Sequence, residues 1–156
     1  MHSNHIVGDV PVPVDANALS LLMSSVGVRA GFPSPAEDSK VDRLDVSELL
    51  VQHPQATFLI RASGISMVDL GIFDRDLLLV DRALTAHHGD VVIAELKGEF
   101  TVKQLYDRNG IVKLLAGNKS YPAIVPREGE TLIIFGVVTW TLTPFRRANV
   151  RFGRCQ

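Results

Sequence analysis

A serine in a small-residue turn and a lysine in an apolar stretch are the residues of this 156-residue chain best suited to chemistry. Ser66 lies in the segment 62–67 (Ala-Ser-Gly-Ile-Ser-Met), and Lys103 is the lysine inside the strand-like stretch 99–105. A serine hydroxyl is a poor nucleophile until a base removes its proton. A lysine can be that base only where burial keeps its amine neutral near pH 7. Ser66 and Lys103 are therefore the candidate nucleophile and general base of a Ser-Lys hydrolase.

The local sequence around each residue supports this interpretation over the simpler one of a turn serine and a surface lysine. Gly64 permits an unusual turn that presents the Ser66 hydroxyl and aims the Ser66 N–H at a developing oxyanion. In a strand, Lys103 shares one face with Thr101 and Leu105, which is not the pattern of a fully solvated face. Lys103 would act first as general base and then as general acid toward the leaving amine.

A third segment, Ala30-Gly31-Phe32-Pro33, has the features of a substrate carried by the enzyme itself. The extended residues 28–30 can pair along a strand edge, Ala30 offers little bulk against the nucleophile, and Pro33 ends strand pairing. We predict that the bond between Ala30 and Gly31 is cleaved. The simpler interpretation is a flexible loop before Pro33.

Composition limits the class of protein. The chain has 16 basic and 17 acidic residues and a net charge of -1, which argues against a general nucleic-acid-binding surface, since such a surface needs a basic face. We also expect no direct sequence-specific DNA binding. The single cysteine, Cys155, fits a reducing cytoplasm. The sequence shows neither a signal peptide nor an apolar run long enough to span a membrane, so we expect a cytoplasmic protein. The adjacent His87 and His88 indicate a solvated turn and not a metal site. We expect no metal or organic cofactor.

The pattern of apolar residues predicts two regions, an N-terminal arm over residues 1–40 and a β-rich peptidase domain over residues 41–156. Residues 17–23 and 42–53 are candidates for short helices. The apolar runs 91–94 and 132–135 predict strands buried on both faces, and the turns 97–98 and 107–110 predict hairpins. Many short strands predict a mainly β, compact, barrel-like fold. The expected strands are 57–62, 76–81, 90–96, 99–106, 111–116 and 131–141.

The chain resembles the LexA/UmuD family of self-cleaving Ser-Lys peptidases, over about residues 28–142. The separation between Ser66 and Lys103 (103 − 66 = 37) matches that family. The resemblance implies a homodimer, activation of cleavage by a RecA–single-stranded DNA filament after DNA damage, and a role in the SOS response. It also implies that residues 31–156 join an error-prone, UmuC-like Y-family polymerase in translesion synthesis. The matching segments are 30–36, 62–67, 71–76, 88–94, 98–103 and 135–138.

Three alternatives are distinguishable from the sequence. A repressor that inactivates itself needs a helix-turn-helix domain, and the 30 residues before Gly31 are too few for one. The alternative that stays open is a self-cleaving LexA-like or phage-like transcriptional regulator that lacks its own DNA-binding domain. A signal peptidase shares the Ser-Gly-x-Ser-Met element but needs a membrane anchor. A non-catalytic β binding module would behave identically after the substitution Ser66→Ala.

Overall fold

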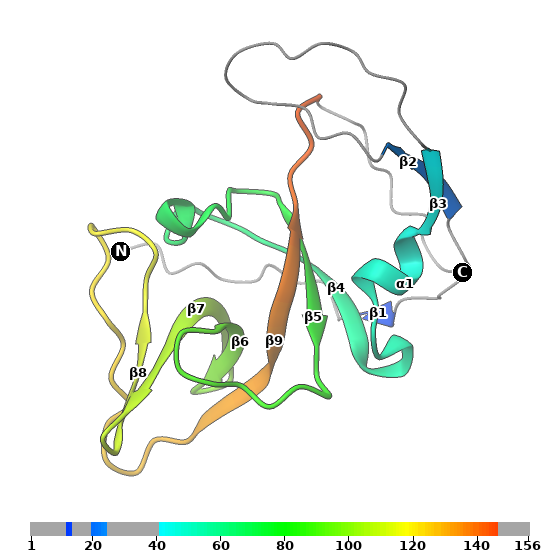
Figure 1. Cartoon of the computed structure of the whole chain (residues 1–156). Coiled ribbons are helices and arrows are strands. Elements are labelled where there is room, and N and C mark those ends of the chain that lie inside the picture. Colours follow the sequence, from blue (N-terminus) through cyan, green and yellow to red (C-terminus); the bar gives the residue numbers. More distant parts are fainter. Residues whose placement is uncertain (1–11, 14–19, 25–40, 147–156) are drawn as a thin grey trace, which may run out of the picture.

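The computed structural model describes residues 12–13, 20–24 and 41–146, and this part of the chain is mainly β, as predicted (Figure 1). It contains one α-helix, α1 (Val46–Leu50), and two 3-10 helices, η1 (Pro54–Ala56) and η2 (Val68–Leu70). The strands are β1 (Val12–Pro13), β2 (Ser20–Ser24), β3 (Val41–Asp45), β4 (Thr57–Arg61), β5 (Leu77–Asp81), β6 (Val91–Leu96), β7 (Glu99–Arg108), β8 (Ile111–Leu115) and β9 (Leu132–Leu142).

Seven of these strands form one antiparallel sheet in the order β1-β4-β5-β9-β6-β7-β8, and β2 pairs with β3 separately. The long strand β9 joins the two halves of the sheet, with β5 on one side and β6 on the other (Figure 1). The ladders on both sides of β9 contain a register shift, at Leu79/Val80 and at Ile93/Ala94. Such irregularities bend a strand and increase its twist. The bend allows the two halves to face a common core.

The main core cluster shows how strongly the sheet curves. Ile60 of β4, Leu78 of β5 and Val102 of β7 are buried in one cluster, although two strands separate β5 from β7 in the sheet. Strands this far apart share a core only when the sheet curls around it, which gives the barrel-like form expected from the sequence. A second cluster, which includes Leu105 and Leu114, packs on the other face of β7.

All six predicted strands are present, with bounds that differ by at most about two residues. Both predicted hairpins are also confirmed. Lys97 and Gly98 join β6 to β7 with φ of 55° and 78°, and Asn109 and Gly110 join β7 to β8 with φ of 53° and 74°. Two consecutive positive φ values match the twist of the flanking strands. The expected solvated turn at His87 and His88 is confirmed by the exposure of both residues.

The predictions of two short helices, over residues 17–23 and 42–53, were wrong over most of their length. Ser20–Ser24 is strand β2, paired with β3, whereas residues 17–19 lie outside the described residues. An isolated helix of this length is unstable, and strand pairing satisfies the backbone instead. Within 42–53, the helix is confined to α1 because Asp45 caps it, accepting from Ser47 N–H at 2.9 Å and Glu48 N–H at 3.2 Å.

The prediction that 91–94 and 132–135 are buried on both faces was half correct. Val92, Ile93 and Ala94 are fully buried. In β9, however, Ile133 is 48% exposed, because this end of the strand pairs with β6 on only one side. Burial of β9 on both faces begins further along, at Gly136 and Val137.

Much of the predicted N-terminal arm, including the Ala30-Gly31 bond, lies outside the described residues, so the predicted boundary at residue 40 stays a prediction. Within the described residues, Val12–Pro13 pairs with β4 at the edge of the large sheet. No helix in the described ranges has the length and apolar character needed to cross a bilayer.

Candidate active site

Ser66 and Lys103 meet in the structure. Lys103 Nζ donates a hydrogen bond to Ser66 Oγ over 2.9 Å, although the two residues lie 37 positions apart. Ser66 is fully buried, and Lys103 is 5% exposed. Lys103 lies within β7, opposite the buried Val92 of β6, so its side chain leaves a rigid and apolar part of the sheet. The sheet therefore places an amine against a hydroxyl in a site with little water.

Burial changes the acidity of the Lys103 amine. Loss of hydration disfavours the charged ammonium and lowers the pKa of Lys103 from 10.5 to about 8. Among the described residues, no carboxylate forms an ion pair with Lys103 that would raise the pKa again. A substantial fraction of the amine is therefore neutral near physiological pH.

Two further acceptors orient this amine. Lys103 Nζ donates to Thr101 Oγ1 at 3.1 Å and to the Val102 carbonyl oxygen at 3.0 Å. A neutral amine has two N–H donors and one lone pair. When these two acceptors hold both donors, the lone pair faces Ser66 Oγ, and the Ser66 hydroxyl can donate its proton in the direction that a general base requires.

The turn that carries Ser66 is held at both ends. Before the turn, Gly64 has a φ of 92°, a conformation that favours glycine, and its N–H donates to Asp74 Oδ1 at 2.7 Å. After the turn, Met67 is fully buried in the main core cluster. The Met67 carbonyl oxygen accepts from Leu70 N–H at 3.1 Å as η2 begins. Ser66 thus lies between Gly64, whose N–H is hydrogen-bonded to Asp74, and the buried Met67.

Asp76 connects this region to the end of β9. Its side chain is 2% exposed, and Oδ2 accepts from Phe73 N–H at 2.8 Å, Thr141 Oγ1 at 3.2 Å and Thr143 Oγ1 at 2.8 Å. Asp74 and Asp76 lie in the turn before β5, and Asp81 ends that strand, which spans Leu77–Asp81. Their carboxylates organise loops and do not approach one another as a paired acid-base site.

The loop that follows β8 also contacts the Ser66 turn, although its sequence gave no reason to expect this. Asn118 Nδ2 donates to the Ile65 carbonyl oxygen at 3.0 Å, and Gly117 N–H donates to Met67 Sδ at 3.3 Å. The only sequence signal for this loop is its Gly-Asn dipeptide, which is typical of a turn. Among the described residues, no group of three or more His, Cys, Asp or Glu side chains could hold a metal ion.

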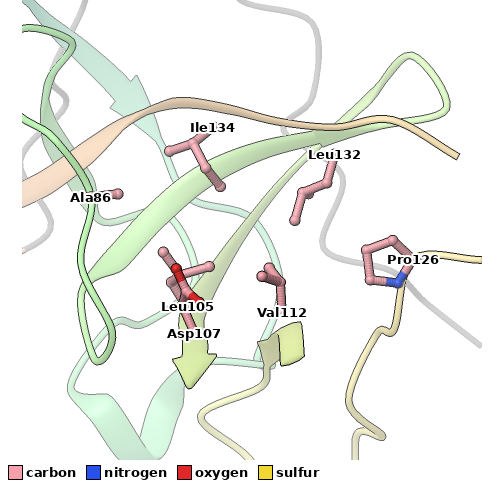
Figure 2. A pocket seen from close by; sticks show the side chains of 7 residues that line it. All are labelled: Ala86, Leu105, Asp107, Val112, Pro126, Leu132 and Ile134. Atoms are coloured by element: carbon pink, nitrogen blue, oxygen red, sulfur yellow. The ribbon is translucent and has the colours of Figure 1, made fainter. Parts of the chain in front are cut away.

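A cavity of about 510 Å³ lies elsewhere, between β7, β8 and the beginning of β9 (Figure 2). Figure 2 shows side chains from β9 on one side of this space and side chains from β7 and β8 facing them. Neither Ser66 nor Lys103 lines it, so its chemistry is separate from that of the pair. The lining residues are Ala86, Leu105, Asp107, Val112, Pro126, Leu132 and Ile134.

Comparison with known proteins gives a consistent result. The model of the family described as Peptidase S24-like matches residues 22–139. The chain is 48% identical over 110 residues to Protein SamA of Salmonella typhimurium, which covers 70% of this chain and 76% of that protein. It is 45% identical over 116 residues to Protein MucA of Escherichia coli, covering 74% and 79%. It is 36% identical over 129 residues to the LexA repressor of Paracidovorax citrulli, covering 82% and 56%. These matches confirm the resemblance inferred from the sequence motifs.

Proposed function

Because the chain belongs to the Peptidase S24-like family, we propose that it is a serine endopeptidase that cleaves itself, with Ser66 as nucleophile and Lys103 as general base. The observation that carries this proposal is the 2.9 Å contact between Ser66 Oγ and the Nζ of a buried lysine. An ion-paired or solvated lysine would remain protonated and could not accept the serine proton.

The proposed reaction begins when neutral Lys103 accepts the Ser66 hydroxyl proton as Oγ attacks the carbonyl carbon of Ala30. The negative charge moves to the carbonyl oxygen, where the Ser66 N–H stabilises it. Lys103 then gives its proton to the amide nitrogen of Gly31, and the bond between Ala30 and Gly31 breaks. An ester between Ala30 and Ser66 remains. Water hydrolyses this ester with neutral Lys103 as base, which frees Ser66.

Mass spectrometry of the full-length chain after incubation with a RecA–single-stranded DNA filament tests this function. We expect two fragments, the larger beginning at Gly31, from the wild type and no fragments from Ser66→Ala. Lys103→Arg is the matched control for charge, since arginine stays protonated and cannot act as the base. A fragment with a different first residue, or efficient cleavage by Lys103→Arg, would contradict the assignment.

We further propose that the processed form, residues 31–156, acts in the SOS response in the cytoplasm as an accessory subunit of an error-prone, UmuC-like Y-family polymerase. Complementation of damage-induced mutagenesis together with such a polymerase tests this role. The pre-cut form carrying Ser66→Ala should restore mutagenesis, because cleavage is complete before the polymerase is bound. Failure of this form where the wild-type precursor succeeds would contradict the accessory role.

The active unit in this proposal is a homodimer. Trp140 and Leu142 of β9 are 42% and 39% exposed, and Phe145, just beyond the strand, is fully exposed. Exposed large apolar side chains near one end of a strand are a frequent feature of protein interfaces. Sedimentation of the wild type should give the mass of a dimer, and Trp140→Ser should shift the equilibrium toward the monomer.

A further inference from the structure

The peptide bond that precedes Ser66 has a polar partner on a distant loop. Asn118, in the loop after β8, donates from Nδ2 to the Ile65 carbonyl oxygen at 3.0 Å across 53 positions of sequence. The same side chain accepts from Ser120 N–H through Oδ1 at 2.9 Å. These two contacts use both ends of the Asn118 amide and fix its orientation. The donor end therefore points at the carbonyl that is joined to the Ser66 nitrogen.

The loop that carries Asn118 is attached to the Ser66 turn at a second point. Gly117 N–H donates to Met67 Sδ at 3.3 Å, and the Gly117 carbonyl oxygen accepts from Asp69 N–H at 2.7 Å. A side chain at position 117 could not fit without movement, since a Cβ there would lie 2.8 Å from Leu70 Cγ. The close backbone approach that Gly117 permits brings Asn118 within hydrogen-bonding distance of Ile65.

The geometry of a trans peptide turns this contact into a constraint on Ser66. The C=O and N–H of one trans peptide are coplanar and point in opposite directions, and the described residues contain no cis peptide bond. Because Asn118 holds the Ile65 carbonyl oxygen, the Ser66 N–H points away from Asn118. Within the part of the chain that the structure describes, this N–H donates to no backbone or side-chain acceptor.

We propose that Asn118 is a positioning residue that sets the plane of the Ile65–Ser66 peptide and thereby aims the Ser66 N–H at the oxyanion formed during cleavage. This inference rests on the proposed function, because the oxyanion exists only if Ser66 attacks a peptide carbonyl. Oxyanion stabilisation depends strongly on the direction of the donor, which must already be set before charge develops. The side-chain hydrogen bonds of Asn118 go to Ile65 and Ser120, so it acts on Ser66 through the backbone.

Two variants of the full-length chain separate this role from a purely structural one. Asn118→Asp keeps an oxygen that can accept from Ser120 N–H but loses the donor to Ile65, whereas Asn118→Ala loses both contacts. We expect both variants to cleave about 10- to 100-fold more slowly than the wild type at the alkaline plateau of the rate. We also expect Asn118→Ala, which adds no charge, to keep the wild-type midpoint of the pH–rate profile, because the contact between Ser66 and Lys103 is intact. Wild type and Ser66→Ala are measured alongside, with thermal unfolding of each variant.

The measured rates and pH midpoints distinguish failure of this inference from failure of the proposed function. A normal rate for Asn118→Asp with a slow Asn118→Ala would show that Asn118 only supports its own loop through Ser120, and a normal rate for Asn118→Ala would show that the donor is unnecessary. Either result overturns the inference and leaves the proposed function intact. A shifted midpoint in Asn118→Ala would also overturn it, because the Ser66–Lys103 contact itself would have changed. A wild type that never cleaves, or cleavage that persists in Ser66→Ala, would overturn the inference and the proposed function together.

Discussion

Raising the pH from 7 to 10 is expected to accelerate self-cleavage of the full-length chain about tenfold, with a midpoint near the Lys103 pKa of about 8. Only neutral Lys103 accepts the Ser66 proton. With this pKa, about 10% of the amine is neutral at pH 7, and nearly all of it is neutral at pH 10. A solvated lysine with a pKa of 10.5 would be neutral in only about 0.03% of molecules at pH 7. Burial therefore increases the neutral base about 300-fold at neutral pH.

The assay follows the first-order loss of intact mass in the protein alone, without a filament, at intervals of half a pH unit. Circular dichroism at each pH verifies that the chain stays folded, and Ser66→Ala measures any background hydrolysis. A rate that is flat or falls between pH 7 and pH 10 in a folded protein would refute the role of Lys103 as base. A rate that still rises steeply above pH 10 would refute the link between burial and the lowered pKa.

Substitutions at three positions give separate tests. Thr101→Val removes one acceptor that orients Lys103 Nζ and should slow cleavage about fivefold in the pH–rate assay without unfolding the chain. Asp74→Ala removes the acceptor for Gly64 N–H and should slow cleavage about tenfold, whereas Asp74→Asn, which keeps an acceptor oxygen, should restore the rate. Lys103→Met should abolish cleavage and also change the pH dependence of stability. The folded state binds the Lys103 proton less tightly than the unfolded chain, so the free energy of unfolding of the wild type should rise by roughly 2 to 3 kcal/mol between pH 7 and pH 10. Denaturant titrations of Lys103→Met should lack this rise, and an equal rise in the variant would contradict the assigned cause.

The large sheet was predictable because its strands carry strong local signals. Alternating or continuous apolar runs specify β4 to β9, and the two-residue turns at 97–98 and 109–110 specify two of the hairpins. The β2–β3 pair was not predictable in the same way. Each of its strands has five residues with little alternation, and its stability depends on a partner distant in the sequence. Asp45, followed by Glu48 three residues later, is the signal in the sequence that marks the start of α1.

The Ser66–Lys103 contact was predicted from residue types and from the family resemblance, and the structure brings the two side chains together. Their supporting contacts were not predicted. Gly64 and Asp74 lie 10 positions apart, and Ile65 and Asn118 lie 53 positions apart. No local pattern distinguishes Asp74 or Asn118 from an ordinary turn residue, because their roles depend on which loop lies opposite in the folded chain. Hydrogen bonds between distant loops that support the reactive pair are found only when the fold of the backbone is known.

Burial of the two reactive groups also determines which substrates suit this site. Ser66 is fully buried and Lys103 is 5% exposed, so the same environment that makes the lysine basic also limits access to the serine. A free peptide must reach this buried serine and must do so at low concentration. A segment of the same chain is present at an effective concentration of about millimolar or higher and gives up little further translational freedom on entering the site. A base that is only about 10% neutral at pH 7 is then sufficient for slow, single-turnover chemistry. The buried pair thus favours cleavage of a tethered segment over general proteolysis, as the proposed self-cleavage requires.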